Sequence, residues 1–348
     1  MLNYGSMMKY EIAQNELRRR PRTWLVTGAA GFIGSHLVEK LLMLDQRVVA
    51  LDNLSTGRRA NIAQIQPSVS AEQWKCLYFI EGDICCLNDC RQACTNVDYV
   101  LHQASLGSIP RSIADPLLIH NNNVNGFINL VIAARDLNVK RFVYASSSAV
   151  YGDSLMLPKM ETNVGKPLSP YAATKLIDEI YAGVFNRCYG LPIIGLRYFN
   201  VFGPRQDPSG TYAAVIPKWI AAILEAKEVI IYGDGETSRD FCYIANVVQA
   251  NLLAAVMDSQ GPTDYAYNIS VGERTSLNEL HYLIQTELKA RIPTLQIASP
   301  RYQEFRIGDA RHSQANIDNA KATLGYLPSH TIIQGLRETI DWYIRNRI

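Results

Sequence analysis

The chain has 348 residues, of which 48% are hydrophobic, so it can bury a large core and more than one compact unit is expected. Its 34 basic and 32 acidic residues give a formal net charge of +2, which argues against nucleic acid as a partner. No apolar run reaches the roughly 18 residues that a membrane-spanning helix needs, so we expect no membrane partner and a cytoplasmic location.

Residues 1–20 are largely polar and show no secretion signal, and a helical extension is expected there. Seven cysteines, an odd number without a secretory context, indicate reduced thiols. Cys86, Cys90 and Cys94 recur every four residues and would share one face of a helix. A metal site is the alternative to a face of small residues, but no CxxC pair or adjacent histidine supports it, so no metal is expected.

The first half of the chain alternates short β-rich runs with helical stretches, which predicts an α/β fold with a doubly wound parallel sheet of the Rossmann type. Strands are expected at 23–27, 47–51, 77–81, 99–101, 141–145 and 193–198, with helices at 34–44, 124–137 and 172–188. Further pieces are expected at 229–232, 266–269, 277–289 and 316–324. We therefore expect a larger domain over 21–200, which also receives residues at about 238–258, and a smaller α/β domain over 201–348.

The first predicted strand runs into a glycine-rich turn that opens a helix. Gly28, Gly31 and a third glycine three residues later would let backbone N–H groups approach a pyrophosphate at the positive end of the helix. A plain strand–helix turn is the alternative. Asp52, at the end of the next strand, favours a dinucleotide, because its carboxylate can accept both ribose hydroxyls of NAD and would repel the 2′-phosphate of NADP. Arg58 and Arg59 keep NADP open as an alternative.

Three patterns together resemble the extended short-chain dehydrogenase/reductases: the GxxGxxG spacing, His102-Gln103-Ala104-Ser105, and Asn122-Asn123-Val124-Asn125-Gly126. The family usually has alanine at the position of Ser105. The resemblance implies NAD as cofactor, with Gln103 and Ala104 along the diphosphate channel and Asn123 bracing the active site. The expected cofactor-binding residues are Gly28, Gly31, Phe32, Ile33, Asp52, Asn53, Asp83, Ile84, Gln103, Ala104, Asn123, Tyr171, Lys175 and Tyr198.

Tyr171 and Lys175 stand four residues apart, one above the other on a predicted helix. A neighbouring ammonium and a positive nicotinamide ring both favour the phenolate form of a tyrosine, which can then act as a base. A surface helix pair is the alternative, but this pair follows a strand that ends in a run of serines, as it does in the family. Counting back four residues from Tyr151 selects Ser147 as the family's catalytic serine, with Ser148 as a helper. The resemblance thus implies Ser147, Tyr171 and Lys175 as the catalytic residues.

The segment Leu196-Arg197-Tyr198-Phe199-Asn200 resembles the substrate side of the same family, which implies a UDP-sugar substrate. Arg239 and Arg306 suit a diphosphate, because guanidinium is a planar fork of donors, although isolated arginines often form surface ion pairs. Asp309 would take a ribose hydroxyl, and the segments around 214–219 and 229–232 would hold uracil. The implied substrate-binding residues are Ser147, Ser148, Asn200, Ala214, Val215, Lys218, Tyr232, Arg239, Arg306, Asp309 and Ser313.

Within the family, the chain most resembles the UDP-N-acetylhexosamine 4-epimerases of bacterial surface-polysaccharide synthesis, such as that of O-antigen. Related sugar 4,6-dehydratases carry an acid pair directly after the catalytic hydroxyl residue, where this chain has Ser148-Ala149. In the related epimerases, the position four residues after Asp309 walls the sugar pocket; a tyrosine there excludes the N-acetyl group, and this chain has the small Ser313.

The resemblance leaves alternatives open. A UDP-glucose 4-epimerase or a UDP-glucuronate 4-epimerase would have the same fold, and the latter requires a cation near the sugar C6. A non-catalytic nucleotide-sensing module is the alternative from another class, although such modules generally lose the tyrosine or the lysine. Family members usually form homodimers through a four-helix interface, made by the helix that carries Tyr171 and the helix near Val124–Leu137, and a homodimer is expected here.

Overall fold

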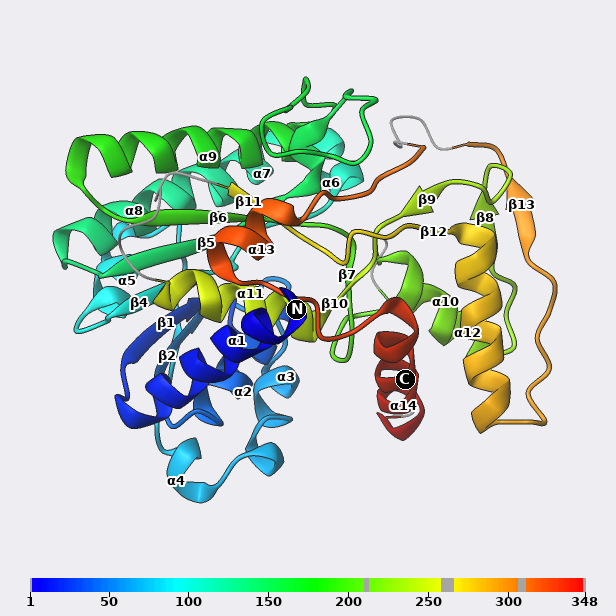
Figure 1. The fold of residues 1–348 in the computed structure, drawn as a ribbon, viewed down its shortest axis with the longest axis horizontal. Helices are drawn as coiled ribbons and strands as arrows, with labels where there is room; N and C mark the ends of the chain where they lie inside the picture. Colours follow the sequence, from blue (N-terminus) through cyan, green and yellow to red (C-terminus); the bar gives the residue numbers. More distant parts are fainter. Residues whose placement is uncertain (1, 210–212, 258–265, 306–310, 347–348) are drawn as a thin grey trace.

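The computed structural model describes residues 2–209, 213–257, 266–305 and 311–346 (Figure 1). Its main sheet has seven strands in the order β3-β2-β1-β4-β5-β6-β11, and all neighbours are parallel. This order contains the 3-2-1-4-5-6 arrangement of doubly wound dinucleotide-binding sheets, and the predicted fold class is confirmed. The strands are β1 (Thr23–Thr27), β2 (Arg47–Asp52), β3 (Leu77–Glu81), β4 (Tyr99–His102), β5 (Arg141–Ser147), β6 (Ile193–Tyr198) and β11 (Ala266–Ile269).

Helices cover both faces of this sheet, as a parallel sheet requires. Along β1, Trp24 and Val26 enter one hydrophobic cluster and Leu25 enters another, because successive side chains of a strand point to opposite faces. On the first face lie α2 (Phe32–Leu42) and α11 (Ile244–Val256), with α1 (Leu2–Arg19) packed against α11 (Figure 1). On the second face lie α5 (Leu87–Cys94), α8 (Gly126–Asp136) and α9 (Pro170–Tyr189) (Figure 1).

A smaller layer lies beside the sheet and is built almost entirely from the chain after β6 (Figure 1). Its helices pack on one another: α10 (Val215–Leu224), α12 (Leu277–Arg291) and α14 (Ile332–Asn346). Short strand pairs tie it together: β7 (Val201–Phe202) with β10 (Cys242–Tyr243), β8 (Ile230–Tyr232) with β13 (Arg301–Gln303), and β9 (Ser238–Arg239) with β12 (Thr275–Ser276). The described chain also has short α-helices: α3 (Arg59–Ala63), α4 (Ala71–Trp74), α6 (Ile109–Ala114), α7 (Pro116–His120) and α13 (Asp318–Leu324).

The predicted elements listed above lie within two residues of the observed bounds, and two of the differences have clear local causes. The helix expected at 124–137 is preceded by a π-helical turn over Asn121–Asn125, and its α-helical part begins at Gly126. α9 begins at Pro170, two residues earlier than expected, because the Ser169 hydroxyl accepts a hydrogen bond from the Ala172 N–H and caps the helix at 3.2 Å.

The expected helix face of small residues contains Cys90 and Cys94 but not Cys86, for which the interpretation is wrong. α5 begins at Leu87, so Cys86 precedes it and is exposed, whereas Cys90 and Cys94 are buried within the helix. Within the described ranges, no group of three or more His, Cys, Asp or Glu side chains could hold a metal ion. No described helix is both long enough and apolar enough to cross a membrane.

A buried ion pair fixes α9 to β6. Glu179 accepts from the Arg197 guanidinium at 2.8 and 2.7 Å and from the Ser146 hydroxyl at 2.6 Å. The side chains of Glu179 and Arg197 are only 10% and 6% exposed. We expect Glu179→Gln to lower the free energy of unfolding by about 3 kcal/mol, because it leaves a buried guanidinium without its counter-charge. Equilibrium urea unfolding measures this, with Glu72→Gln in an exposed pair as the control; equal effects would contradict the prediction.

Candidate active site

Three cavities follow one another along the carboxyl end of the sheet. The first lies at the ends of β1, β2 and β4, the second at the ends of β5 and β6, and the third in the smaller layer. The first and second share Phe32, Ile33, Gln103, Ser105 and Gly107. The second and third share Asn200, Val201, Ala214 and Arg239. A long ligand, or two ligands end to end, can therefore occupy the row.

The first cavity contains the glycine turn. Gly28 has a φ of +64°, and a side chain there would press on the Ala104 backbone at 2.8 Å. A Cβ on Gly34 would lie 2.0 Å from the Gly28 carbonyl oxygen, so the start of α2 can approach this turn only with glycine. The turn therefore presents bare backbone at a helix N-terminus, which fits a dinucleotide pyrophosphate. The expected cofactor residues that line this cavity are Gly28, Gly31, Phe32, Ile33, Asp52, Asn53, Ile84 and Gln103.

Asp52 lies at the end of β2 and faces this turn. Its carboxylate accepts from the N–H groups of Ala30 at 2.9 Å and Leu54 at 2.8 Å, and the residue is 7% exposed. Burial raises the pKa of Asp52 and these two hydrogen bonds oppose that shift. Arg58 and Arg59 pair with Asp207 and Glu81, so each already has a carboxylate partner. That pairing argues against a role for the two arginines in binding the 2′-phosphate of NADP.

Other expected cofactor residues lie around this cavity rather than in its wall. Asn53 donates to the Asp83 carboxylate at 3.0 Å, which orders the turn that precedes Ile84. Asn123 is 1% exposed; it exchanges hydrogen bonds with the Leu106 backbone and donates to the Thr174 hydroxyl at 3.1 Å. Asn123 therefore links the Leu106 segment to α9, while its neighbour Asn122 lines the cavity.

The second cavity brings together the serine, tyrosine and lysine that the sequence singled out. Ser147 ends β5 and Ser148 directly follows it, Tyr171 and Lys175 are on α9, and Tyr198 ends β6. The Ser147 hydroxyl accepts from the Ala149 N–H at 3.1 Å, and its own hydrogen stays available to a ligand. The arrangement can hold a hydroxyl group of a ligand between a serine and a tyrosine beside a buried ammonium.

A hydrogen-bonded chain holds the wall between the first two cavities. The Tyr198 hydroxyl donates to Gln103 Oε1 at 3.1 Å and accepts from Asn251 Nδ2 at 2.8 Å. Gln103 Nε2 in turn donates to Asn251 Oδ1 at 3.2 Å. Sequence reasoning missed Asn251, which sits on α11, far along the chain from both partners. Burial raises the pKa of Tyr198, so this phenol stays protonated and serves as a fixed donor.

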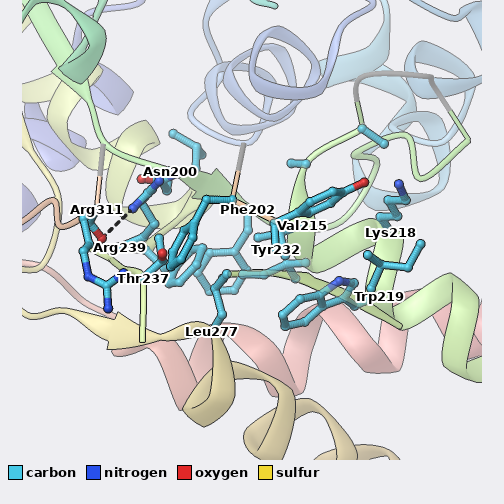
Figure 2. Close-up of a pocket in the computed structure, with 17 residues that line it drawn as sticks. Asn200, Phe202, Val215, Lys218, Trp219, Tyr232, Thr237, Arg239, Leu277 and Arg311 are labelled. Atoms are coloured by element: carbon cyan, nitrogen blue, oxygen red, sulfur yellow. Dashed lines mark hydrogen bonds between the residues drawn. The ribbon is translucent and has the colours of Figure 1, made fainter. Parts of the chain in front are cut away.

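The third cavity, of about 330 Å³, is shown in Figure 2. Asn200, Arg239 and Arg311 gather at one end, and Lys218 and Trp219 lie at the other (Figure 2). The expected residues that line it are Asn200, Ala214, Val215, Lys218, Tyr232 and Arg239. The residues that sequence reasoning missed include Phe202, Trp219, Thr237, Phe241, Phe305 and Arg311. Arginine at one end and aromatic rings along the walls suit a nucleotide with its phosphates toward the second cavity.

An isolated β-bridge brings residues 311–313 to the second and third cavities. Ser238 and His312 pair in parallel, the Ser313 N–H donates to the Ser238 carbonyl oxygen at 3.0 Å, and the Ser238 hydroxyl bonds His312 Nδ1 at 2.8 Å. This places His312 and Ser313 in the wall of the second cavity. Arg306 and Asp309, expected to bind the diphosphate and a ribose, lie outside the described residues.

The sequence matches the model of the NAD-dependent epimerase/dehydratase family over residues 24–270. The UDP-glucose 4-epimerase of Mycolicibacterium smegmatis is 34% identical over 324 residues, which cover 93% of this chain and 98% of the relative. The UDP-N-acetylglucosamine 4-epimerase of Methanobrevibacter ruminantium, solved with UDP-N-acetylmuramic acid, is 38% identical with a TM-score of 0.84 and covers 94% of this chain and 99% of its own. The UDP-glucose 4-epimerase of Thermotoga maritima, solved with UDP-glucose, is 34% identical with a TM-score of 0.83 and covers 94% and 100%.

The family match covers most of the chain, and the relatives match over nearly their whole lengths. The seven-stranded sheet, the glycine turn and the acidic end of β2 fit the bound NAD that the family description implies. The chain therefore belongs to the NAD-dependent epimerase/dehydratase family.

Proposed function

We propose that the chain is a UDP-sugar 4-epimerase that interconverts UDP-GlcNAc and UDP-GalNAc. The observation that carries the proposal is the second cavity, which contains Ser147, Tyr171 and Lys175 and adjoins the glycine turn on one side and the Arg239 pocket on the other. A sugar held there lies between a cofactor and its own nucleotide. The UDP-sugar relatives and the match to an N-acetylglucosamine epimerase support the assignment.

In the proposed reaction, Tyr171 takes the proton of the sugar 4-hydroxyl while the Ser147 hydroxyl bonds the same oxygen. The Lys175 ammonium favours the phenolate that this transfer requires. NAD, which the glycine turn and Asp52 would hold, would supply the redox chemistry at the sugar C4. Arg239 and the aromatic pocket hold the nucleotide, so that the sugar can turn about its bond to the diphosphate without leaving the site.

The lining of the second cavity supports epimerisation rather than loss of water. None of the described residues that line it is Asp or Glu. Elimination of water requires an additional acid and base, and Ser148 and Ala149 stand where related dehydratases have an acid pair. The site therefore has the groups to move one hydride and one proton.

A UDP-glucuronate 4-epimerase is a second candidate, and one observation favours it. Lys159 lines the second cavity and is a cation of the kind that a C6 carboxylate requires. Its Nζ already donates to the Ser154 carbonyl oxygen, and burial lowers the pKa of Lys159. Both features weaken Lys159 as a carboxylate ligand, and we rank this candidate second.

A panel of UDP-sugars tests the proposal. Purified protein should contain NAD and interconvert UDP-GlcNAc and UDP-GalNAc, followed by NMR, without consuming added NADH. Faster epimerisation of UDP-glucose or of UDP-glucuronate would replace the proposed substrate with that sugar. A protein that binds UDP-sugars but turns over none of them would instead be a nucleotide-sensing module.

The position of Asp52 predicts a preference for NAD over NADP. We expect Asp52→Asn, which removes the charge and keeps an acceptor for one of the two loop N–H groups, to narrow that preference by about tenfold or more, the worth of one charge-assisted hydrogen bond. Binding of both cofactors to apoprotein, measured by calorimetry, checks this. Wild-type protein isolated with NADP, or an unchanged ratio in the variant, would contradict it.

We propose a homodimer through α9 and α8, which would form a four-helix interface with the same helices of the second copy. The support is an apolar surface on α9, where Ile180 is 58% exposed and Val184 is 36% exposed. Ile180→Glu should convert the dimer to monomers in sedimentation velocity, because it puts a charge in an apolar interface. Ile333→Glu on the distant α14 is the control. A variant at Ile180 that stays dimeric would contradict this interface.

The cysteines support a location in a reducing compartment such as the cytoplasm, since all seven are free thiols.

We further propose that the product supplies N-acetylhexosamine units for bacterial surface polysaccharide such as O-antigen. Loss of the gene should remove N-acetylgalactosamine from that polysaccharide, and an unchanged polymer composition would refute the role.

A further inference from the structure

A buried ion pair lies directly beneath the reaction site. Lys175 Nζ is 3.2 Å from the Asp178 carboxylate oxygen Oδ2, one helical turn further along α9. The side chains are 2% and 0% exposed, so water does not screen the interaction. The proposed reaction gives Asp178 no task, although it is the carboxylate nearest to the ammonium on which Tyr171 depends.

Asp178 differs from the acid that follows it. Glu179 is neutralised by the Arg197 guanidinium and bonded by Ser146. Oδ1 of Asp178, by contrast, is buried without a hydrogen-bond partner in the described chain, and so is Nε2 of the nearby His102. Burial raises the pKa of Asp178, and the Lys175 ammonium opposes that shift. The charge of Asp178 is thus compensated chiefly by the ammonium that also serves Tyr171.

Other titratable groups on the elements packed against α9 have partners or lie further away. His102 Nδ1 bonds the Thr27 hydroxyl at 2.7 Å, and burial lowers the pKa of His102 to about 3, so it stays neutral. Burial raises the pKa of Tyr144, which stays a phenol. Tyr151 and Arg197 form a network with Glu179, Tyr198 bonds Gln103 and Asn251, and Arg141 on β5 donates to the carbonyl oxygens of Ala254 and Met257. The remaining groups are Arg111, His120, Arg135 and Asp136 on α6, α7 and α8, and Asp115 between α6 and α7.

We propose that Asp178 is a positioning residue that sets the pH range of the reaction, by holding the Lys175 ammonium in competition with the phenolate of Tyr171. The inference rests on the proposed function, in which Tyr171 is the base. Tyr171 and Asp178 are seven residues apart on one helix, which is about 10 Å along its axis. A carboxylate at that distance in a poorly screened site disfavours a second negative charge on the same helix.

Asp178→Asn tests the proposal, because it keeps the shape and removes the charge. We expect the acidic limb of the profile of kcat/KM against pH for UDP-GlcNAc to move to lower pH by about one unit, the effect of one charge at about 10 Å with an effective dielectric constant of about 20. Asp136→Asn, which removes an exposed carboxylate on α8, is the control and should leave the limb in place. A purely structural role would lower the rate at every pH without moving the limb.

An unmoved limb, or one that moves to higher pH, would overturn the proposal. Asp178→Ser is equally neutral and should shift the limb in the same direction if the asparagine variant folds poorly. Ultraviolet titration of phenolate in the NAD-bound protein, with and without Tyr171→Phe, tests the role of Tyr171 as base separately from the role of Asp178. If Tyr171→Phe leaves rate and limb intact, the proposed base is wrong; if the limb depends on Tyr171 but ignores residue 178, only the role of Asp178 is wrong.

Discussion

Replacing Tyr171 by phenylalanine is expected to lower UDP-sugar turnover by at least about 100-fold, the usual contribution of a general base. The change removes one oxygen from the wall of the second cavity and leaves the ring. Fold and NAD content should therefore stay near those of the wild type. Steady-state epimerisation, circular dichroism and the absorbance of released cofactor measure the three quantities.

Tyr189→Phe is a matched control for this variant, since Tyr189 is on the same helix but is 54% exposed and lies outside the second cavity. It should retain full turnover. A Tyr171→Phe enzyme with near-normal rates would remove Tyr171 as the base and leave Ser147 as the group to examine. Loss of NAD from the variant would instead point to a role in cofactor binding.

The strands of the sheet could be predicted because each is a short apolar run between polar or glycine-rich turns. The bounds expected at 23–27, 77–81, 193–198 and 266–269 are those of β1, β3, β6 and β11. The strand order was not predicted, because pairing depends on contacts between distant segments. β11 pairs with β6 although some 70 residues separate them, and no local pattern encodes that register.

The site residues also divide into those that local sequence predicts and those that depend on contacts between distant segments. The glycine turn and Asp52 could be found because function and local backbone geometry coincide there. Arg311 could not, because it reaches the third cavity only through the bridge that pairs His312 with Ser238. The sequence signal that could have indicated a phosphate-binding role for Arg311 is the basic pair Arg311-His312 just before Ser313. The Lys175–Asp178 contact is local, at i and i+3, but a carboxylate in that spacing usually forms a solvated helix pair. Burial distinguishes the two cases, and burial depends on the tertiary fold.

The sugar preference rests on Ser313, and a change there has the second large expected effect. The backbone N–H of Ser313 is fixed to the Ser238 carbonyl oxygen at 3.0 Å, so its side chain cannot easily retreat from the second cavity. Ser313→Tyr fills that wall with a ring. We expect turnover of UDP-GlcNAc and UDP-GalNAc to fall by at least about 100-fold, while UDP-glucose and UDP-galactose are still accepted, because only the N-acetyl group needs the space.

Ser313→Ala separates the size of this side chain from its hydroxyl. Room alone permits the larger sugar, whereas a preference for it requires contacts, and Asn200 and Ser148 in the same cavity can supply them. The alanine variant should keep the N-acetylated pair as good substrates, since the space remains. Assays of all four UDP-sugars with both variants, at matched NAD content, give the comparison. Full activity of Ser313→Tyr on UDP-GalNAc would mean that Ser313 does not wall the sugar pocket, and the proposed substrate would lose its structural basis.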